Sequence, residues 1–556
     1  MPATWDFSSL PLRPDACRVL AFNGEESLLG GYAFDILLLA AGVSARDAPQ
    51  LQEDLLRAPL ITLTGKRASG ETFPRHGMAA EISYLFSEGG GAVFRVSLRP
   101  RSFRLELCAH SRIFLHMPLP DILAKVLKEE TLTAGNDFQN NLSATYKARP
   151  YTCQYNESSA AFLLRHLERV GGYAFIRQTD KGDTLVLADG ATQTERLPVR
   201  DDLTWSEDHA DETVFSLARI RSVSPTKATL RDYSTEQPGM TVKSSGAENS
   251  LLLGGGEINR YAGCNLYGEV DAATKDFIVE EAETAAANLS AIRVRALVAK
   301  ANRAEGESSV PWLQAGFTFA LGGESFQLLS VRHACNLAED DMEERIVRRA
   351  RQAGFVAGTA QGYRNAFACH PLALGPYAPE CRTPRPNVPG LVHAKVDAAG
   401  DGQYAELDRH GRYKVMFFFP EKVIHTDADD PSEGNRSIPL RMAQAHAGQS
   451  SGIHFPLLKG SEVLVAFTDG DPDRPVILSA MPNPEHPSVV ADENQQSNML
   501  QSPGGHKIDL TDTEGQKRLS LETPGGHRII MRDENGKREL RLESPCGGSY
   551  IRLHEK

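Results

Sequence analysis

The C-terminal segment repeats the same turn three times, as Gln501-Ser-Pro-Gly-Gly-His506, Glu522-Thr-Pro-Gly-Gly-His527 and Glu543-Ser-Pro-Cys-Gly-Gly548. The three prolines stand 21 residues apart. Between the turns, pairs of apolar residues with a spacing of two recur about every half repeat. Two-residue spacing places both members on one face of a strand and the charged residues between them on the other. The apolar set is Ile508, Leu510, Leu519, Leu521, Ile529, Met531, Leu540, Leu542, Ile551 and Leu553.

This apolar stripe poses a problem of burial. Nothing else in residues 499–556 is available to cover it, and a small sheet with one bare apolar face is not stable alone. Its edges would also be open to pairing with other chains. Regular strand–turn repeats are typical of β-helical shafts, so the pattern favours several chains wound together with their stripes on a common axis. A monomeric β-meander packed against the preceding domain is the alternative, and the number of chains does not follow from the periodicity.

A small barrel is expected upstream of the repeat. Residues 376–388 are rich in proline, which fixes φ and cannot donate to a strand ladder, and therefore read as a linker. Residues 389–485 then contain five strand-like runs separated by Gly, Asp and Pro turns, which suit an OB-fold. Residues 486–498 form a second linker before the needle of residues 499–556. The five runs are 391–396, 412–419, 438–444, 462–467 and 476–479.

The N-terminal region, residues 1–375, is expected to be mainly β with a few helices. Apolar spacing predicts helices over 120–127 and 158–170. A third helix is expected over 272–289, which is rich in Ala and Glu and only weakly amphipathic. Ser158 suits the N-cap of the second helix, and Gly171 suits its end. The rest alternates strand-length apolar runs with turns.

Length and composition limit the number of domains and the classes of function that the chain can have. A chain of 556 residues predicts three or four domains. Its net charge of −12 disfavours binding to nucleic acid. The start lacks the pattern of a secretory signal peptide, and the longest apolar run, residues 36–43, is too short for a membrane helix. The chain is therefore expected to be made in the cytoplasm.

We find no catalytic constellation in the sequence. The G-x-S-x-G string at residues 448–452 is followed by Ile453-His-Phe-Pro456, which cannot open the helix that a nucleophile elbow needs. His506 and His527 recur in the repeat, but turn-flanking surface positions are expected for them rather than a stacked metal site. The acidic group at 427–433 is interpreted as a solvated loop, with a cation site as the alternative. The group at 469–473 is interpreted as a turn, because Pro472 and Pro475 break the ligand order of a calcium loop. We therefore expect no enzyme activity, no cofactor and no metal.

Several motifs together resemble the VgrG spike proteins of type VI secretion systems, which are similar to the fused hub and needle of contractile phage tails. The most specific is Gly460-Ser-Glu-Val-Leu-Val-Ala-Phe-Thr-Asp-Gly-Asp-Pro-Asp-Arg-Pro475, which resembles the family run G-x-E-V-x-V-x-F-x-x-G-D-P-D-R-P. The resemblance covers nearly the whole chain in the same order. Further matching segments are Ser111-Arg-Ile-Phe114, Gln154-Tyr-Asn-Glu-Ser158, Gly171-Gly-Tyr-Ala-Phe175, Asp232-Tyr233, Asp408-Arg-His-Gly-Arg-Tyr-Lys-Val415 and Arg441-Met-Ala-Gln-Ala-His-Ala-Gly448.

The sequence departs from the family at two tryptophan positions. Phe417-Phe-Phe-Pro420 stands where F-x-W-D is common, and Ser437-Ile-Pro-Leu-Arg-Met442 stands where S-C-W-I-R-V is usual. These differences leave open a related contractile phage-tail or bacteriocin-like particle. An effector-carrier module is a second alternative, and a hydrolase acting on cell-wall glycan is the weakest.

The resemblance implies a homotrimer with N-terminal β-barrel hub domains, an OB-fold collar and a needle that is an intertwined triple-stranded β-helix. The ten apolar residues of the repeat are then the core of the trimeric shaft. The hub is implied to sit on a hexameric tube of Hcp, and the needle to carry a PAAR-repeat tip protein. Effector or adaptor proteins are implied as cargo, and the particle is implied to leave through the type VI apparatus. The repeat still runs at Lys556, so no effector domain is expected in this chain.

Overall fold

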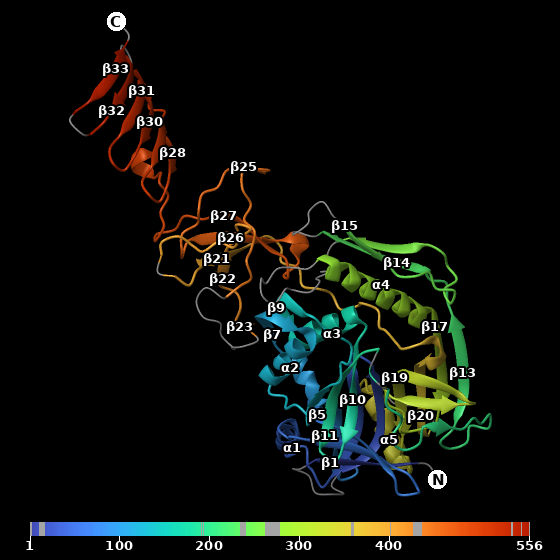
Figure 1. Cartoon of the computed structure of the whole chain (residues 1–556). Helices are drawn as coiled ribbons and strands as arrows, with labels where there is room; N and C mark the ends of the chain where they lie inside the picture. The colour runs from blue at the N-terminus through green and yellow to red at the C-terminus, as the bar shows by residue number, and fades with distance from the viewer. Residues whose placement is uncertain are drawn as a thin grey trace. The chain divides into compact units, whose positions relative to one another are not determined.

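The computed structural model describes residues 3–9, 17–190, 192, 194–233, 241–261, 279–356, 361–400, 402–425, 436–534, 537–545 and 548–554. It is mainly β, as expected (Figure 1). Two compact units are present. Unit one comprises Met1–Val388, Pro420–Asp430 and Asp471–Asp473, and unit two comprises Pro389–Phe419, Pro431–Gly470 and Arg474–Lys556.

A twelve-stranded sheet dominates unit one. Its strands are β1 (Thr4–Ser9), β2 (Cys17–Ser27), β3 (Gly31–Ala41), β4 (Ile61–Lys66), β5 (Thr72–Glu88), β6 (Gly91–Arg99), β12 (Asp202–Leu203), β13 (Val214–Arg221), β17 (Asn302–Ser308), β18 (Thr318–Leu321), β19 (Glu324–Asn336) and β20 (Gly362–Pro371). The main path runs β1-β4-β5-β6-β3-β2-β19-β20-β17-β13, and β18 joins β19 to β12. Strands from the two ends of the unit meet where β2 pairs with β19, with Ala21 opposite Asn336.

The helix expected over 120–127 is present as α2 (Leu119–Glu129). It follows β7 (Ala109–Pro118) directly and buries its apolar side, including Ile122 and Leu123, in the main core of unit one. Because these side chains recur at helical spacing, a single face carries all of them.

The helix expected over 158–170 is also present, as α3 (Ser159–Val170). The Ser158 hydroxyl accepts a hydrogen bond from the Ala161 amide at 3.1 Å, which satisfies one of the unpaired N–H groups at the helix start. Gly171 ends the helix with a φ of 71°, a left-handed conformation that glycine adopts without strain.

The third expected helix, over 272–289, is only partly matched. The structure has α4 (Val279–Ala301), and residues 272–278 lie outside the described residues. The helix continues past Leu289 because Val294, Leu297 and Val298 pack against Leu252 and the neighbouring sheet.

The sequence interpretation missed α1 (Ala48–Leu56) and α5 (Asp341–Gln352). A cap signal for α5 was available, since Asp340 accepts a hydrogen bond from the Glu343 amide at 2.8 Å. The described helices include none that is long and apolar enough to cross a membrane. Short 3-10 helices are η1 (Arg101–Glu106), η2 (Leu372–Leu374), η3 (Thr468–Gly470) and η4 (Asp492–Asn494).

Three small sheets complete unit one, in the orders β10-β11-β8, β15-β14-β16 and β23-β7-β9. Their remaining strands are β8 (Phe138–Asn140), β9 (Ala148–Ser158), β10 (Tyr173–Thr179), β11 (Gly182–Ala188), β14 (Lys227–Tyr233), β15 (Thr241–Ser245), β16 (Glu257–Tyr261) and β23 (Lys422–His425). Strand β23 pairs in parallel with β7 and places Lys422 opposite Arg112. A segment from the expected barrel therefore adds a strand to the hub.

The barrel of unit two has a four-stranded sheet in the order β22-β21-β26-β27 and a two-stranded hairpin, β24-β25. One of the five expected strands, the one over 438–444, is not formed, so that prediction was wrong. That run contributes only isolated bridges through Leu440 and Met442, because Pro439 has no N–H to donate to a continuous ladder. The strands are β21 (Leu391–Asp397), β22 (Lys414–Phe417), β24 (Ala447–Gly448), β25 (Ser451–Gly452), β26 (Glu462–Phe467) and β27 (Pro475–Ala480).

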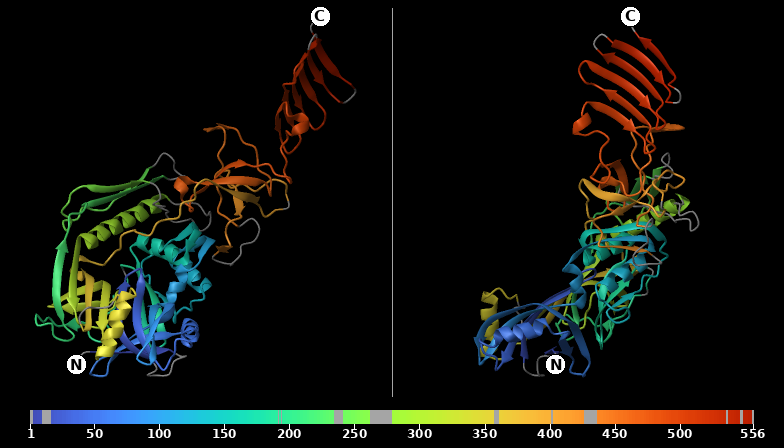
Figure 2. Two further views of the ribbon diagram at one scale, coloured as in Figure 1. Left: turned by 180° about the vertical axis from the view of Figure 1, so that it is seen from behind. Right: turned by 90° about the vertical axis from the view of Figure 1, so that its left-hand side faces the viewer.

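The tail of unit two is one antiparallel sheet of six consecutive strands, β28 to β33. Figure 2 shows the strands side by side in a single layer. They are β28 (Ser497–Gln501), β29 (Lys507–Thr511), β30 (Gln516–Glu522), β31 (Arg528–Glu534), β32 (Lys537–Glu543) and β33 (Tyr550–His554).

Candidate functional site: the apolar face of the tail

The Pro-Gly-Gly turns set the spacing of the tail strands. Gly526 has a φ of 80°, which other residues adopt only with strain. The Thr523 hydroxyl accepts a hydrogen bond from the His527 amide at 3.2 Å, and Ser502 accepts one from the His506 amide at 3.1 Å. Equivalent residues of the first two repeats thus make the same turn.

This register aligns the ten apolar residues into two columns that cross the sheet. In the first column, Ile508 lies opposite Leu521, Leu521 opposite Ile529, Ile529 opposite Leu542 and Leu542 opposite Ile551. The second column links the other five members in the order Leu510, Leu519, Met531, Leu540 and Leu553. Cross-strand neighbours on one face lie about 4.5–5.5 Å apart at Cβ, so each column is a continuous apolar ridge.

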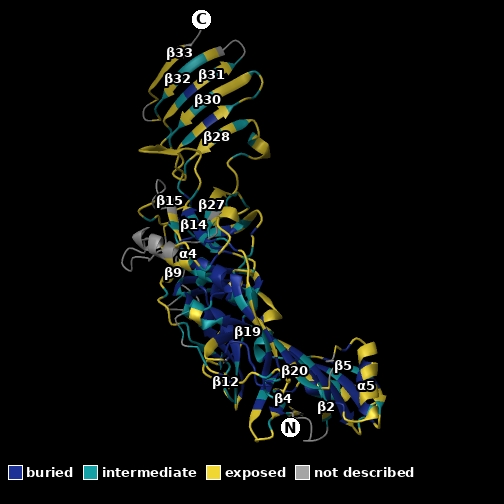
Figure 3. Cartoon of the chain, turned by 90° about the vertical axis from the view of Figure 1, so that its right-hand side faces the viewer, coloured by how far each residue is buried: buried dark blue, intermediate teal, exposed yellow. Residues whose placement is uncertain are grey.

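Both columns are open to solvent in one chain. Three members are half-buried, and the other seven are 36–62% exposed, with the highest values at Ile551 and Leu553. Figure 3 shows the tail largely in the colour of exposed residues. Contiguous apolar surfaces that stay exposed on folded chains are candidate sites of association.

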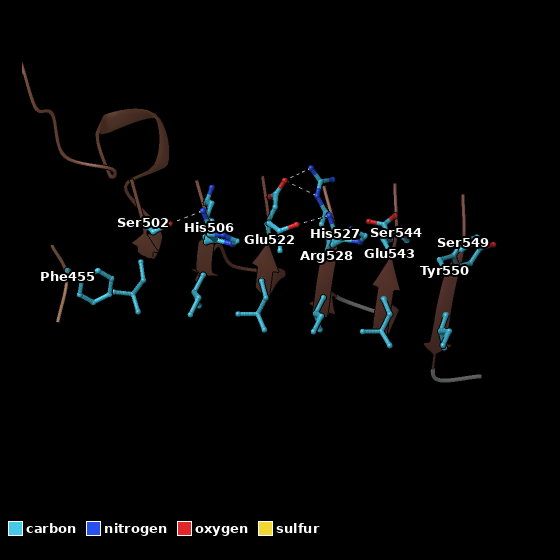
Figure 4. A pocket seen from close by; sticks show the side chains of 18 residues that line it. Phe455, Ser502, His506, Glu522, His527, Arg528, Glu543, Ser544, Ser549 and Tyr550 are labelled. Carbon is cyan, nitrogen blue, oxygen red and sulfur yellow. Dashed lines mark hydrogen bonds and ion pairs between the residues drawn. The ribbon is translucent and has the colours of Figure 1, made fainter. Parts of the chain in front are cut away.

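The first column lines a hollow of about 750 Å³ (Figure 4). The turn residues His506, Glu522, His527 and Tyr550 line the same hollow. A second hollow of about 640 Å³ follows the second column. Each is an open groove along a ridge of side chains rather than an enclosed chamber, and charged residues such as Arg518 and Arg532 also line the second.

The opposite face of the tail is charged and pairs its own charges. Arg528 contacts Glu522 at 2.8 Å, and Arg518 contacts Asp509 at 3.2 Å. Asp509 is buried beneath such neighbours, as is Ile530. The two faces therefore differ in kind: the charged face forms ion pairs within the chain, and the apolar face is left open to solvent.

Two residues that border the columns were missed in the sequence. Leu500 on β28 lies opposite Ile508 and extends the first column by one strand. Phe455, from the barrel, lines the same hollow, and Figure 4 shows its ring at the end of the row of apolar side chains. Leu500 lies before the first Pro-Gly-Gly turn, so the repeat gave no signal for it.

Unit one contains a buried ionic cluster around Glu26. Arg75 Nε donates a hydrogen bond to Glu26 Oε1 at 2.6 Å, and His333 Nε2 lies 3.3 Å from the same oxygen. Burial alone raises the pKa of Glu26, but the charge of Arg75 and the contacts with His333 outweigh it and lower this pKa to about 2. Burial also lowers the pKa of His333. All three side chains are buried, so we interpret the cluster as structural.

The structure describes most of the remaining candidates for chemistry. Ser450 has a φ of 57° in the turn of the β24-β25 hairpin, which is not a strand-to-helix elbow. Asp471 contacts Arg385 at 2.5 Å, and Asp473 accepts a hydrogen bond from the Cys153 amide at 2.6 Å. The acidic residues at 427–433 lie outside the described residues. His506 and His527 are exposed beside their turns, and within the described ranges no three His, Cys, Asp or Glu side chains gather as a metal site would need.

Residues 25–336 match the family model of the phage tail baseplate hub (GPD), and residues 424–481 match the type VI secretion system/phage-baseplate injector OB domain. The chain belongs to the phage tail baseplate hub (GPD) family. Its resemblance to the VgrG spike proteins of type VI secretion systems is confirmed by relatives that carry this name.

One such relative is the type VI secretion system spike protein VgrG1c of Pseudomonas aeruginosa, which is 27% identical over 487 residues. The match covers 85% of this chain and 61% of that relative, so the chain spans less than two thirds of its length. A solved type VI secretion component of E. coli, described as similar to the T4 bacteriophage tail proteins gp27 and gp5, has a TM-score of 0.53 at 20% identity and covers 85% and 99% of the two chains. A chain of the Francisella PdpA-VgrG complex has a TM-score of 0.57 at 11% identity and covers 100% and 88%.

Proposed function

We propose that three copies of this chain form the puncturing spike of a type VI secretion machine. The observation that carries the proposal is the pair of apolar columns, which remain open to solvent in one chain. Three tails wound together bury these columns on a common axis and remove the open sheet edges. The ten apolar residues Ile508, Leu510, Leu519, Leu521, Ile529, Met531, Leu540, Leu542, Ile551 and Leu553 are then the shaft core.

The wider assembly follows from the same proposal. The hub of residues 1–375 caps the inner tube of Hcp, the barrel of residues 389–485 forms a collar, and the needle of residues 499–556 carries a PAAR-repeat tip. The particle is made in the cytoplasm and passes through the type VI apparatus, with effector or adaptor proteins as cargo. The Francisella complex, named for PdpA and VgrG together, supports a spike that binds a partner protein.

The chain acts in this proposal as a mechanical part and not as an enzyme. Support comes from the buried or turn-bound state of the candidate catalytic groups described above. A role in a contractile phage-tail or bacteriocin-like particle is the competing assignment, since the family includes phage hubs.

The oligomer is tested by the mass and shape of the purified protein. We expect light scattering to give about three times the 60.7 kDa chain mass, and electron micrographs to show a bulb with one thin needle. A monomer at micromolar concentration contradicts the proposal.

The machine is tested in the bacterium that produces the chain. We expect the protein in the culture supernatant of the parent strain and its loss from the supernatant when the type VI sheath is deleted. Release that needs prophage induction and persists without the sheath assigns the chain to the competing particle.

A further inference from the structure

A hairpin of the barrel stands out as the most exposed ordered segment of unit two. Every one of residues 443–455, here called the barrel arm, is exposed. The arm is rooted on β27, where the Ala443 amide donates a hydrogen bond to the Ile477 carbonyl at 2.7 Å. In Figure 1 the arm carries the label β25 and projects from the barrel strands β21 to β27.

Beyond its root, the described hydrogen bonds of the arm join arm residues to one another. Ala447 pairs with Gly452, the Ile453 amide donates to the His446 carbonyl at 3.0 Å, and Gln444 Nε2 lies 3.1 Å from His454 Nδ1. A lone hairpin with two-residue strands is at best marginally stable in water. An arm with this geometry therefore needs a surface to lie against.

The composition of the arm indicates that this surface is a protein interface. Residues 442–458 contain no Asp, Glu, Lys or Arg, in a chain where these residues make up 24%. Charged residues are depleted at the centre of interfaces and favoured on free surfaces. Ile453 and Phe455 are both 49% exposed in one chain. The arm thus has the composition of an interface, although it is exposed to solvent in a single chain.

The apolar end of the arm continues the first column of the tail. Phe455 and Leu500 line the same hollow as Ile508 and Leu521. Leu500 is still 52% exposed there. In a shaft of three chains, the surface that covers an apolar column belongs to another copy. We therefore infer that a neighbouring chain packs against Phe455 and Leu500.

We propose that the barrel arm of each copy packs against the base of the neighbouring copy's tail, with Phe455 of one chain against Leu500 of the next. The inference rests on the trimeric shaft proposed above and names a second contact that closes it. The arm thereby joins the barrel of one chain to the tail of the next.

The test uses two full-length chains with different affinity tags. One carries Phe455→Cys and the other carries Leu500→Cys, and the two are co-expressed and isolated through both tags in turn. We expect oxidation to produce a disulfide-linked species that contains both tags on a non-reducing gel. The wild-type pair, oxidised in the same way, measures the background from native cysteines such as the exposed Cys108.

A matched control replaces Phe455→Cys with Leu478→Cys. Leu478 is 41% exposed on β27 of the same barrel but outside the arm, so we expect little cross-linking from it. Equal cross-linking by Leu478→Cys overturns the proposal. So does a disulfide that forms only when both cysteines are in one chain, because the arm then closes on its own tail.

The two proposals fail in different ways. If no particle is retained by both tags, the chains do not associate and the spike itself is contradicted. If particles with both tags are recovered but the Phe455→Cys/Leu500→Cys link does not form, the shaft stands and only the arm contact is wrong.

Discussion

Leu542→Asp is the sharpest test of the apolar columns. Leu542 lies in the first column between Ile529 and Ile551 and is 39% exposed in one chain. Since fully burying a leucine is worth ~1.5–3 kcal/mol, burying the remainder in the shaft contributes about 1 kcal/mol per copy. At the same rate, the seven exposed column members, which are 36–62% exposed, contribute on the order of 20 kcal/mol across three chains.

The aspartate does more than remove this contribution. An ionised carboxylate buried without a partner costs several kcal/mol, and three copies face one another on the axis with like charge. We therefore expect L542D to lose on the order of 10 kcal/mol per trimer, about half of the gain from the columns. That loss is sufficient to dissociate the shaft at micromolar concentration.

Sedimentation velocity at micromolar concentration measures the outcome. We expect L542D to sediment as a monomer while the thermal unfolding of its hub, followed by circular dichroism, stays at the wild-type temperature. Gln516→Asp is the matched control, because Gln516 is exposed on the charged face of β30. Retention of the trimer by L542D refutes the assignment of the apolar face to the shaft axis.

Four further predictions concern the hub and the turns. Glu26→Gln breaks the buried pair with Arg75 and is expected to lower the free energy of unfolding of the hub by about 3–5 kcal/mol in urea. Because the pKa of Glu26 is lowered from 4.5 to about 2, the stability it supplies is present above its ordinary pKa, and we expect about 3 kcal/mol to be lost as pH falls from about 5 to about 2. Gly526→Ala places a Cβ at a φ of 80° and is expected to cost about 1–2 kcal/mol per copy, read as a lower dissociation temperature of the trimer. Ser158→Ala removes the cap on the Ala161 amide and is expected to destabilise the hub by about 1 kcal/mol in urea.

Each of these has an internal control. The acid-induced loss of stability is expected to be shallower in Glu26→Gln than in the wild type, and an unchanged pH profile contradicts the role given to this carboxylate. Gly525→Ala, at a neighbouring position without positive φ, is expected to leave the trimer intact, so equal effects at Gly525 and Gly526 argue against backbone strain. Ser158→Asp restores a capping oxygen, and its failure to recover stability shows that the loss has another cause.

Local signals in the sequence predicted the parts of the fold that depend on neighbouring residues. The apolar spacing of α2 and the Ser158 cap of α3 are both found in the structure. Where a local signal was lost, the prediction was wrong: Pro439 interrupts the run at 438–444, which forms bridges instead of a strand. The end of α4 was placed too early because its last turns are held by packing against Leu252, which lies outside the helix itself.

The pairing of distant strands was beyond local reasoning. Strand β2 lies beside β19, and β23 joins β7, although each pair is separated by some 300 residues. Many strands offer unpaired edges of similar chemistry, so the choice among them depends on burial summed over the whole sheet and not on any one segment. The barrel arm was missed for a related reason. The sequence shows that its residues are uncharged, but only the structure shows that they are exposed.

The sequence by itself determined which face of each tail strand is apolar. Side chains alternate along a strand with a period of two, so the covalent chain alone sorts the ten apolar residues from the charged ones. Only the tertiary structure decided that these residues align into two unbroken columns, that Leu500 and Phe455 border the first of them, and that one chain leaves both columns open. Alignment across strands is a matter of register, which the stacked turns and the hydrogen bonds between strands set together.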